Sequence, residues 1–81
     1  MQVTINFYSY FKDLAGCDRA TETVSPGTTL AELFDRVCAR FPRLVPMRRS
    51  TLMAVGLEYR EMNWVLRDGD EVALFPPVQG G

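Results

Sequence analysis

The chain has 81 residues, 47% of them hydrophobic and 23% charged, and nine basic against ten acidic residues give a net charge of −1. This length fits one domain, and the composition is that of a folded globular protein, which excludes general disorder. The balanced charge argues against a surface for nucleic acid or anionic membranes, so we expect neither as a partner.

Cysteine and histidine usage excludes the common metal and redox sites. The chain has two cysteines, no histidine and no CxxC pair, so zinc and dithiol redox motifs are absent and we expect no metal site. Cys38 falls on an apolar helical stripe and is expected in the core, whereas Cys17 follows a glycine in an expected exposed loop. The sequence leaves a disulfide between them open. Without a signal peptide or an apolar run of about 18 residues, we expect a cytoplasmic protein with reduced thiols.

The first third of the chain reads as two strands around a short loop. Residues 2–8 alternate, which predicts a half-buried strand with Val3, Ile5 and Phe7 toward the core and Tyr8 on the opposite face. Residues 10–17 form a loop with a short helical turn that ends at Gly16. Residues 19–24 form a second strand, which ends at the turn Ser25-Pro26-Gly27.

The clearest element is a helix that begins after Thr29. Thr29 and Glu32 have the spacing of a capping box, and Pro42 ends the helix near Phe41. Apolar residues recur at helical spacing, and we expect them to pack in the core: Leu30, Leu33, Phe34, Val37, Cys38 and Phe41.

The second half contains three further strands. Residues 42–50 are expected to be an irregular, basic connection, residues 51–55 a third strand, and residues 57–59 a short edge strand. A polar turn, Asp68-Gly69-Asp70, precedes the last strand, residues 71–75, in which Val72 and Leu74 should face the core. The order predicts an α+β domain of the ubiquitin-like β-grasp type. In this fold one main helix packs on one face of a mixed sheet, whose first and last strands are parallel neighbours.

The end of the chain is the unusual segment. Pro76 and Pro77 cannot donate to a strand ladder, so the domain should span residues 1–75 and a flexible, extended tail residues 76–81. Such a tail reaches roughly 20 Å, and its two final glycines allow it to enter a narrow site. Its reactive group is the α-carboxylate of Gly81. Physical reasoning alone leaves an inert, frayed terminus equally open.

No catalytic constellation accompanies this tail. No histidine is available for acid–base work, no Ser or Cys lies in a nucleophile motif, and no glycine-rich loop precedes a helix. We therefore expect no catalytic residue in the chain itself.

The closing segment, Asp-Gly-Asp-Glu-Val-Ala-Leu-Phe-Pro-Pro-Val-Gln-Gly-Gly at residues 68–81, resembles the carboxyl terminus of the MoaD family, the small sulfur-carrier subunits of molybdopterin synthase. The resemblance extends over the whole chain. It includes residues 11–16, the Thr-capped helix and the strand at residues 53–55. One departure is Gly56, where the family commonly has Asn.

The resemblance implies a sulfur-donor role without catalysis. An ATP-dependent, ubiquitin-activating-like adenylyltransferase of the MoeB type would adenylate the carboxylate of Gly81, and a sulfurtransferase would supply sulfur for a thiocarboxylate. Pro76, Pro77, Val78, Gln79 and Gly80 would then enter the active site of the large synthase subunit, of the MoaE type, which holds the catalytic residues. The chain would bind no cofactor itself, since the ATP is used by the activating enzyme.

Three alternatives stay open. A ThiS-type carrier of thiamine synthesis also ends in Gly-Gly, although such carriers tend to be shorter and lack the Phe-Pro-Pro approach. A ubiquitin-like modifier would share the activation step but form an isopeptide bond to lysine. The third alternative is a binding module with an inert tail.

The expected partner surface lies on the sheet face opposite the helix. By strand parity Tyr8 and Phe75 share this face, and parallel pairing of their strands would bring them together beside the tail. Tyr59 would join them from the edge strand, and Lys12 would add a charged contact at the rim. Both the activating enzyme and the large subunit are expected to dock there, as the resemblance implies.

Overall fold

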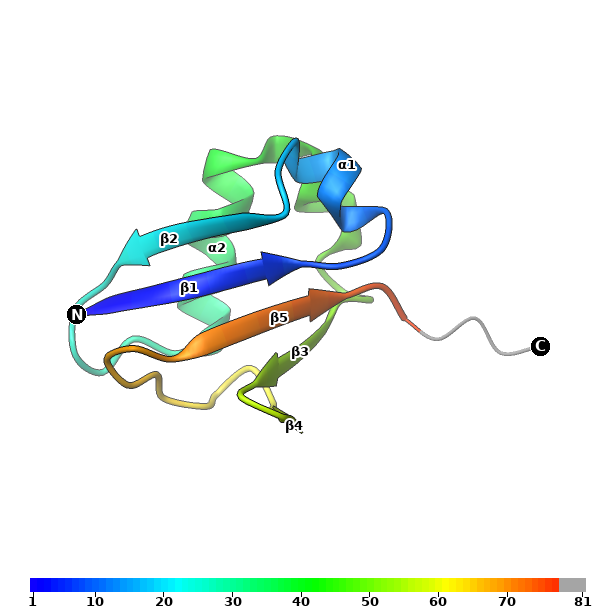
Figure 1. Cartoon of the computed structure of the whole chain (residues 1–81). Helices are drawn as coiled ribbons and strands as arrows, with labels where there is room; N and C mark the ends of the chain where they lie inside the picture. Colours follow the sequence, from blue (N-terminus) through cyan, green and yellow to red (C-terminus); the bar gives the residue numbers. More distant parts are fainter. Residues whose placement is uncertain (78–81) are drawn as a thin grey trace.

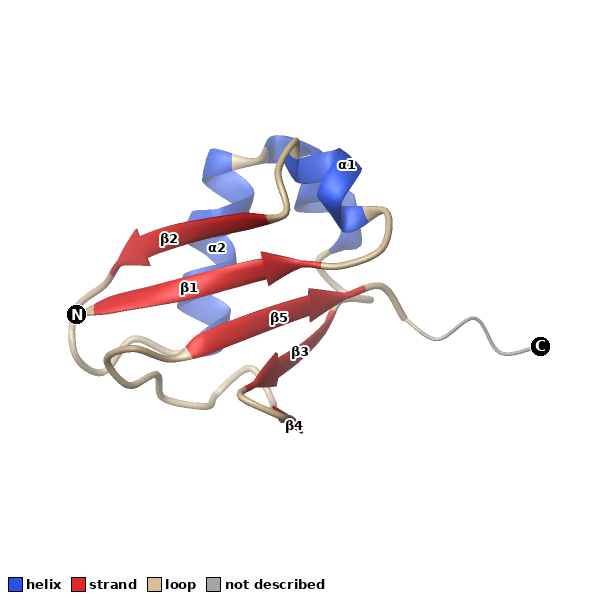
Figure 2. Ribbon diagram, in the orientation of Figure 1, coloured by secondary structure: helices blue, strands red, loops and turns tan. Residues whose placement is uncertain are grey.

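The computed structural model describes residues 1–77 and consists of one five-stranded sheet with the longest helix packed on one face (Figures 1 and 2). The elements in chain order are β1 (Gln2–Phe7), α1 (Phe11–Ala15), β2 (Arg19–Thr23), α2 (Leu30–Arg40), the 3₁₀ helix η1 (Pro42–Met47), β3 (Leu52–Val55), β4 (Glu58–Tyr59) and β5 (Glu71–Phe75). The strands lie side by side in the order β2-β1-β5-β3-β4.

The two central strands are β1 and β5, which pair in parallel with Ile5 opposite Val72 and Phe7 opposite Leu74. The remaining pairs are antiparallel. These four side chains are almost wholly buried beneath α2, since alternation places every second residue of each strand on the helix side. The predicted β-grasp fold and the central parallel pair are therefore confirmed.

Helix α2 begins at the predicted capping box. The Glu32 N–H donates to Thr29 Oγ1 at 3.3 Å, and the Thr29 N–H donates to Glu32 Oε1 at 3.0 Å. Phe41, at the C-cap, is partly buried against the core. The other five residues of the predicted stripe are buried: Leu30, Leu33, Phe34, Val37 and Cys38. The helix thus covers one face of the sheet and leaves the other open (Figure 1).

The connection after α2 was predicted to be irregular, and this prediction was wrong. Residues 42–47 form the 3₁₀ helix η1, in which the Leu44 N–H donates to Phe41 O at 3.0 Å. Pro42 suits a first helical position, where its missing N–H costs nothing, and Leu44 fills the core with 0% of its surface exposed. Burial of Leu44 anchors η1 to the core, although the segment has no repeating apolar pattern that would predict a helix.

Strand boundaries shift by one residue from those predicted. β1 ends at Phe7 rather than Tyr8, because Ser9 takes a left-handed φ of 57° that turns the chain into α1. Tyr8 nevertheless keeps its N–H bonded to Leu74 O at 3.2 Å. β2 ends at Thr23, β3 begins at Leu52 and β4 begins at Glu58.

Gly56 lies in the turn between β3 and β4 with φ 65°. Asn is the residue that best tolerates this left-handed region after glycine. The departure from the family pattern noted above therefore preserves the backbone conformation of the turn.

The two cysteines carry free thiols, so the disulfide that the sequence left open is not formed. Cys38 is buried as predicted, and burial raises the pKa of its thiol. Cys17 was expected to be exposed but is half-buried, because it packs against the edge of the core.

The two aspartates of the turn before β5 accept hydrogen bonds from the backbone. Asp68 Oδ1 accepts a hydrogen bond from the Gln2 N–H, and Asp70 Oδ2 accepts one from the Arg67 N–H, both at 2.8 Å. Asp68 thereby ties the turn to the start of β1, in keeping with a polar turn. Within residues 1–77, no helix is long and apolar enough to cross a membrane.

Candidate docking face and carboxyl-terminal tail

Three aromatic side chains meet on the open face of the sheet. The rings of Tyr8 and Phe75 stack with centroids 4.8 Å apart and planes 11° from parallel. Tyr59 approaches Phe75 edge-on, with centroids 6.2 Å apart. Tyr8 is 45% and Tyr59 67% exposed, so both rings present apolar surface outward. The contact predicted from strand parity is thus present, while its role in docking stays a prediction.

The register of β3 adds a residue that our sequence reasoning missed. Leu52 lies opposite Phe75 and is 36% exposed, so it extends the apolar surface between the two central strands and the edge. Strand alternation could have identified Leu52 once β3 was taken as the neighbour of β5, since a residue paired with Phe75 lies on the same face of the sheet. We call Tyr8, Leu52, Tyr59 and Phe75 the aromatic face.

The beginning of the tail adjoins the aromatic face directly. β5 ends at Phe75, as the two prolines predicted, and Pro76 and Pro77 follow it half-buried and without regular structure. The other predicted tail residues, Val78, Gln79, Gly80 and Gly81, lie outside the described residues. A partner seated on the aromatic face would therefore contact the chain at the point where the tail starts.

Lys12 is brought to the rim of this face. It lies on α1, is exposed, and lines an open hollow together with Tyr8. The structure therefore brings all four predicted docking residues to one side of the molecule. Residues 1–77 contain no group of three or more His, Cys, Asp or Glu arranged to hold a metal ion.

Comparison with known proteins places this geometry in a family. Residues 5–81 match the model of the ThiS family, a span that includes the whole tail. Molybdopterin synthase sulfur carrier subunits from Escherichia coli and Homo sapiens are 35% and 30% identical to this chain. The alignments cover 98% of this chain and 99% of the bacterial protein, and 99% of this chain and 94% of the human protein.

Solved structures show the same fold. SAMP1 from Haloferax volcanii, a small archaeal modifier protein, superposes with a TM-score of 0.89 at 21% identity over all of both chains. A chain from the complex of subunits 1 and 2 of the molybdopterin-converting factor of Helicobacter pylori superposes at 0.70, with 23% identity over all of both chains. At these identities the likeness concerns the fold alone. The family match over residues 5–81 and the two full-length relatives carry the assignment, and this chain belongs to the ThiS family.

Proposed function

We propose that this chain is the sulfur-carrier subunit of a molybdopterin synthase. The observation that carries the proposal is that similarity runs through Gly81 and that the full-length relatives are molybdopterin synthase sulfur carrier subunits. A ThiS-type carrier for thiamine is less favoured, because these relatives serve molybdopterin synthase. The free thiols of both cysteines support a cytoplasmic location.

The proposed chemistry takes place on the carboxylate of Gly81. A carboxylate is a poor electrophile, so an activating enzyme of the MoeB type joins it to AMP from ATP and releases pyrophosphate. The terminal sulfur of a sulfurtransferase persulfide then displaces AMP and forms an acyl disulfide. A thiol reductant cleaves its S–S bond, which releases the sulfurtransferase thiol and leaves a thiocarboxylate, a nucleophilic, transferable sulfur. Two such sulfurs build the dithiolene of molybdopterin.

The chain's own contribution is delivery rather than catalysis. The aromatic face docks the large subunit, and residues 76–80 carry Gly81 into that subunit's active site, where the catalytic residues lie. Support for such a partner comes from the Helicobacter pylori complex, in which a protein of this fold is bound to a second subunit. Support for the docking face comes from the exposed aromatic rings beside the start of the tail.

Intact-mass measurement of protein from the native cell tests this function. Replacement of the terminal hydroxyl by a thiol adds about 16 Da, and we expect a fraction of the protein to carry this increment. The sulfurated protein, mixed with the large subunit and precursor, should then yield molybdopterin. Isopeptide adducts on lysines of other proteins, without the mass increment, would instead establish a modifier. If neither the thiocarboxylate nor an isopeptide adduct is found, the chain would be a binding module with an inert tail.

A further inference from the structure

A hollow opens on the sheet's open side next to Tyr8, where the end of β1, α1 and the start of β2 meet. It is lined by Asn6, Phe7, Tyr8, Lys12, Asp18 and Arg19. Since Tyr8 belongs both to this hollow and to the aromatic face, the hollow borders that face.

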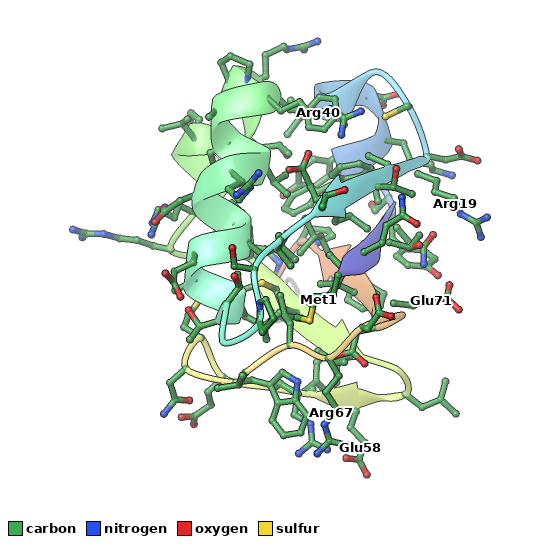
Figure 3. The ribbon with its side chains drawn as sticks, turned by 90° about the vertical axis from the view of Figure 1, so that its left-hand side faces the viewer. Met1, Arg19, Arg40, Glu58, Arg67 and Glu71 are labelled. Carbon is green, nitrogen blue, oxygen red and sulfur yellow. The ribbon has the colours of Figure 1, made fainter. Side chains whose placement is uncertain are left out.

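Arg19 is held in place across three neighbouring strands. Its Nε donates to Asn6 Oδ1 at 3.2 Å, and Asn6 Nδ2 donates to Glu71 Oε1 at 3.4 Å. Arg19 and Glu71 both project from the side of the sheet away from α2 (Figure 3). Because Nε is engaged, the guanidinium is oriented while its two terminal amino groups remain available as a planar pair of donors.

The cations of the hollow differ from most of the others on the surface. Four arginines form ion pairs with carboxylates of this chain: Arg36 and Arg40 with Glu22, Arg48 with Asp35, and Arg60 with Glu58. In residues 1–77, neither Lys12 nor Arg19 has a carboxylate oxygen within 4.0 Å. Asp18 lines the same hollow, and Glu71 lies beside it through its bond with Asn6, but neither carboxylate pairs with Lys12 or Arg19.

We propose that the hollow receives an Asp or Glu side chain of the protein that docks on the aromatic face. Arg19 would present paired N–H donors to the carboxylate and Lys12 a point charge beside it. Which protein docks rests on the proposed function. A carboxylate attached to an apolar docking surface fits better than a free multivalent anion, because Asp18 repels added negative charge and the hollow is open to water.

This inference adds Arg19 and Asn6 to the docking residues predicted from sequence. Arg19 would contact the partner, whereas Asn6 would act as a positioning residue through Arg19. Charge pairs at such a rim set the orientation and the association rate, and a slower association weakens the affinity in proportion. The hollow would thereby also fix the register in which the tail meets the partner.

Carbodiimide cross-linking tests the contact directly, because Lys12 is the single lysine of the chain. In complexes with the large subunit, and separately with the activating enzyme, we expect an amide between Lys12 Nζ and a partner Asp or Glu, identified by peptide mass. The other amine, at Met1, donates to Val24 O at 2.9 Å and serves as an internal comparison. Absence of a Lys12 adduct from both complexes would overturn the proposal.

Affinity measurements on variants test the arrangement. Arg19→Gln should weaken binding about tenfold. The matched control Arg36→Gln changes an exposed arginine of α2, on the helix side of the sheet, and should leave the affinity unchanged. Asn6→Ala should weaken binding less, and should have no further effect when Arg19 is already Gln. Equal affinities for Arg19→Gln and Arg36→Gln would overturn the proposal, as would saturable binding of inorganic phosphate without a Lys12 cross-link. The thiocarboxylate mass decides the proposed function independently of these results.

Discussion

Tyr8 and Phe75 stack face to face at 4.8 Å, although they come from opposite ends of the chain. Parallel pairing of β1 with β5 brings them together, because each ring lies at or just beyond the end of its central strand. Aromatic pairs of this kind contribute about 0.5–1.5 kcal/mol beyond the area they bury. The pair thus forms an apolar platform at the point where the tail begins.

We predict that Tyr8→Ala and Phe75→Ala each weaken binding of the large subunit by about 1–3 kcal/mol, since aromatic anchors dominate interface energies. The two losses should be less than additive, because each substitution removes the same stacked contact. Titration calorimetry on both single variants and the double variant measures this coupling.

Val45→Ala is the control for these two variants, since Val45 is an exposed apolar residue on η1, away from the aromatic face. Its affinity should equal that of the unchanged protein. Thermal unfolding must show that each variant folds. Folded Tyr8 and Phe75 variants with normal affinity would place the docking surface elsewhere.

Deletion of Gly81 should abolish sulfur transfer and leave stability unchanged, because β5 ends at Phe75 and Leu74 is the last core residue within residues 1–77. Circular dichroism and thermal unfolding would check the fold, and molybdopterin formation with the large subunit would check transfer. Any molybdopterin formed by the truncated protein would contradict the carrier function.

Gly80→Val should slow adenylation or sulfur transfer without changing the unfolding temperature. The β-branched side chain adds bulk and restricts φ and ψ where the tail must pass through a narrow channel. Pyrophosphate exchange on the activating enzyme and single-turnover transfer would separate the two steps. Unchanged rates in both assays would mean that the channel tolerates a side chain.

Thr29→Ala should lower the free energy of unfolding by about 1 kcal/mol, because it removes the side-chain acceptor of the capping box. Thr29→Ser keeps the hydroxyl and should retain most of the stability. Chemical denaturation of the three proteins measures the difference. Equal losses in the Ala and Ser variants would show that the cap contributes through its methyl group instead.

At pH 8 Cys17 should react with a thiol reagent before Cys38. Burial raises the pKa of Cys38, so less of its reactive thiolate is present at a given pH, and the side chain is also shielded. Rates for Cys17→Ser and Cys38→Ser, followed from pH 7 to pH 10, should show the Cys38 reaction rising at the higher pH. Faster labelling of Cys38 at pH 8 would contradict this order.

The elements with a regular apolar pattern were predictable from sequence, because the need to bury one face of a strand or helix determines that pattern. Burial of one face accounts for β1, β5 and α2, and the Thr29–Glu32 spacing located the start of the helix. Tyr8 and Phe75 followed from the same alternation once the two strands were taken as parallel neighbours.

Features that depend on single tertiary contacts were not predictable. η1 is held by Leu44, whose burial depends on the space between α1, α2 and the sheet rather than on a local pattern. The hollow beside Tyr8 likewise joins residues from β1, α1 and β2, and Arg19 carries no sequence signal that distinguishes it from the other arginines.

The position of β5 has a mechanical consequence. Because β5 is bonded to β1 on one side and β3 on the other, a pull on Pro76 along the strand acts across both ladders at once. The hydrogen bonds lie across the direction of such a pull and are loaded together in shear, whereas an edge strand would peel away one bond at a time. A partner that draws the tail into its own active site therefore loads two ladders together, rather than the single ladder that would hold an edge strand.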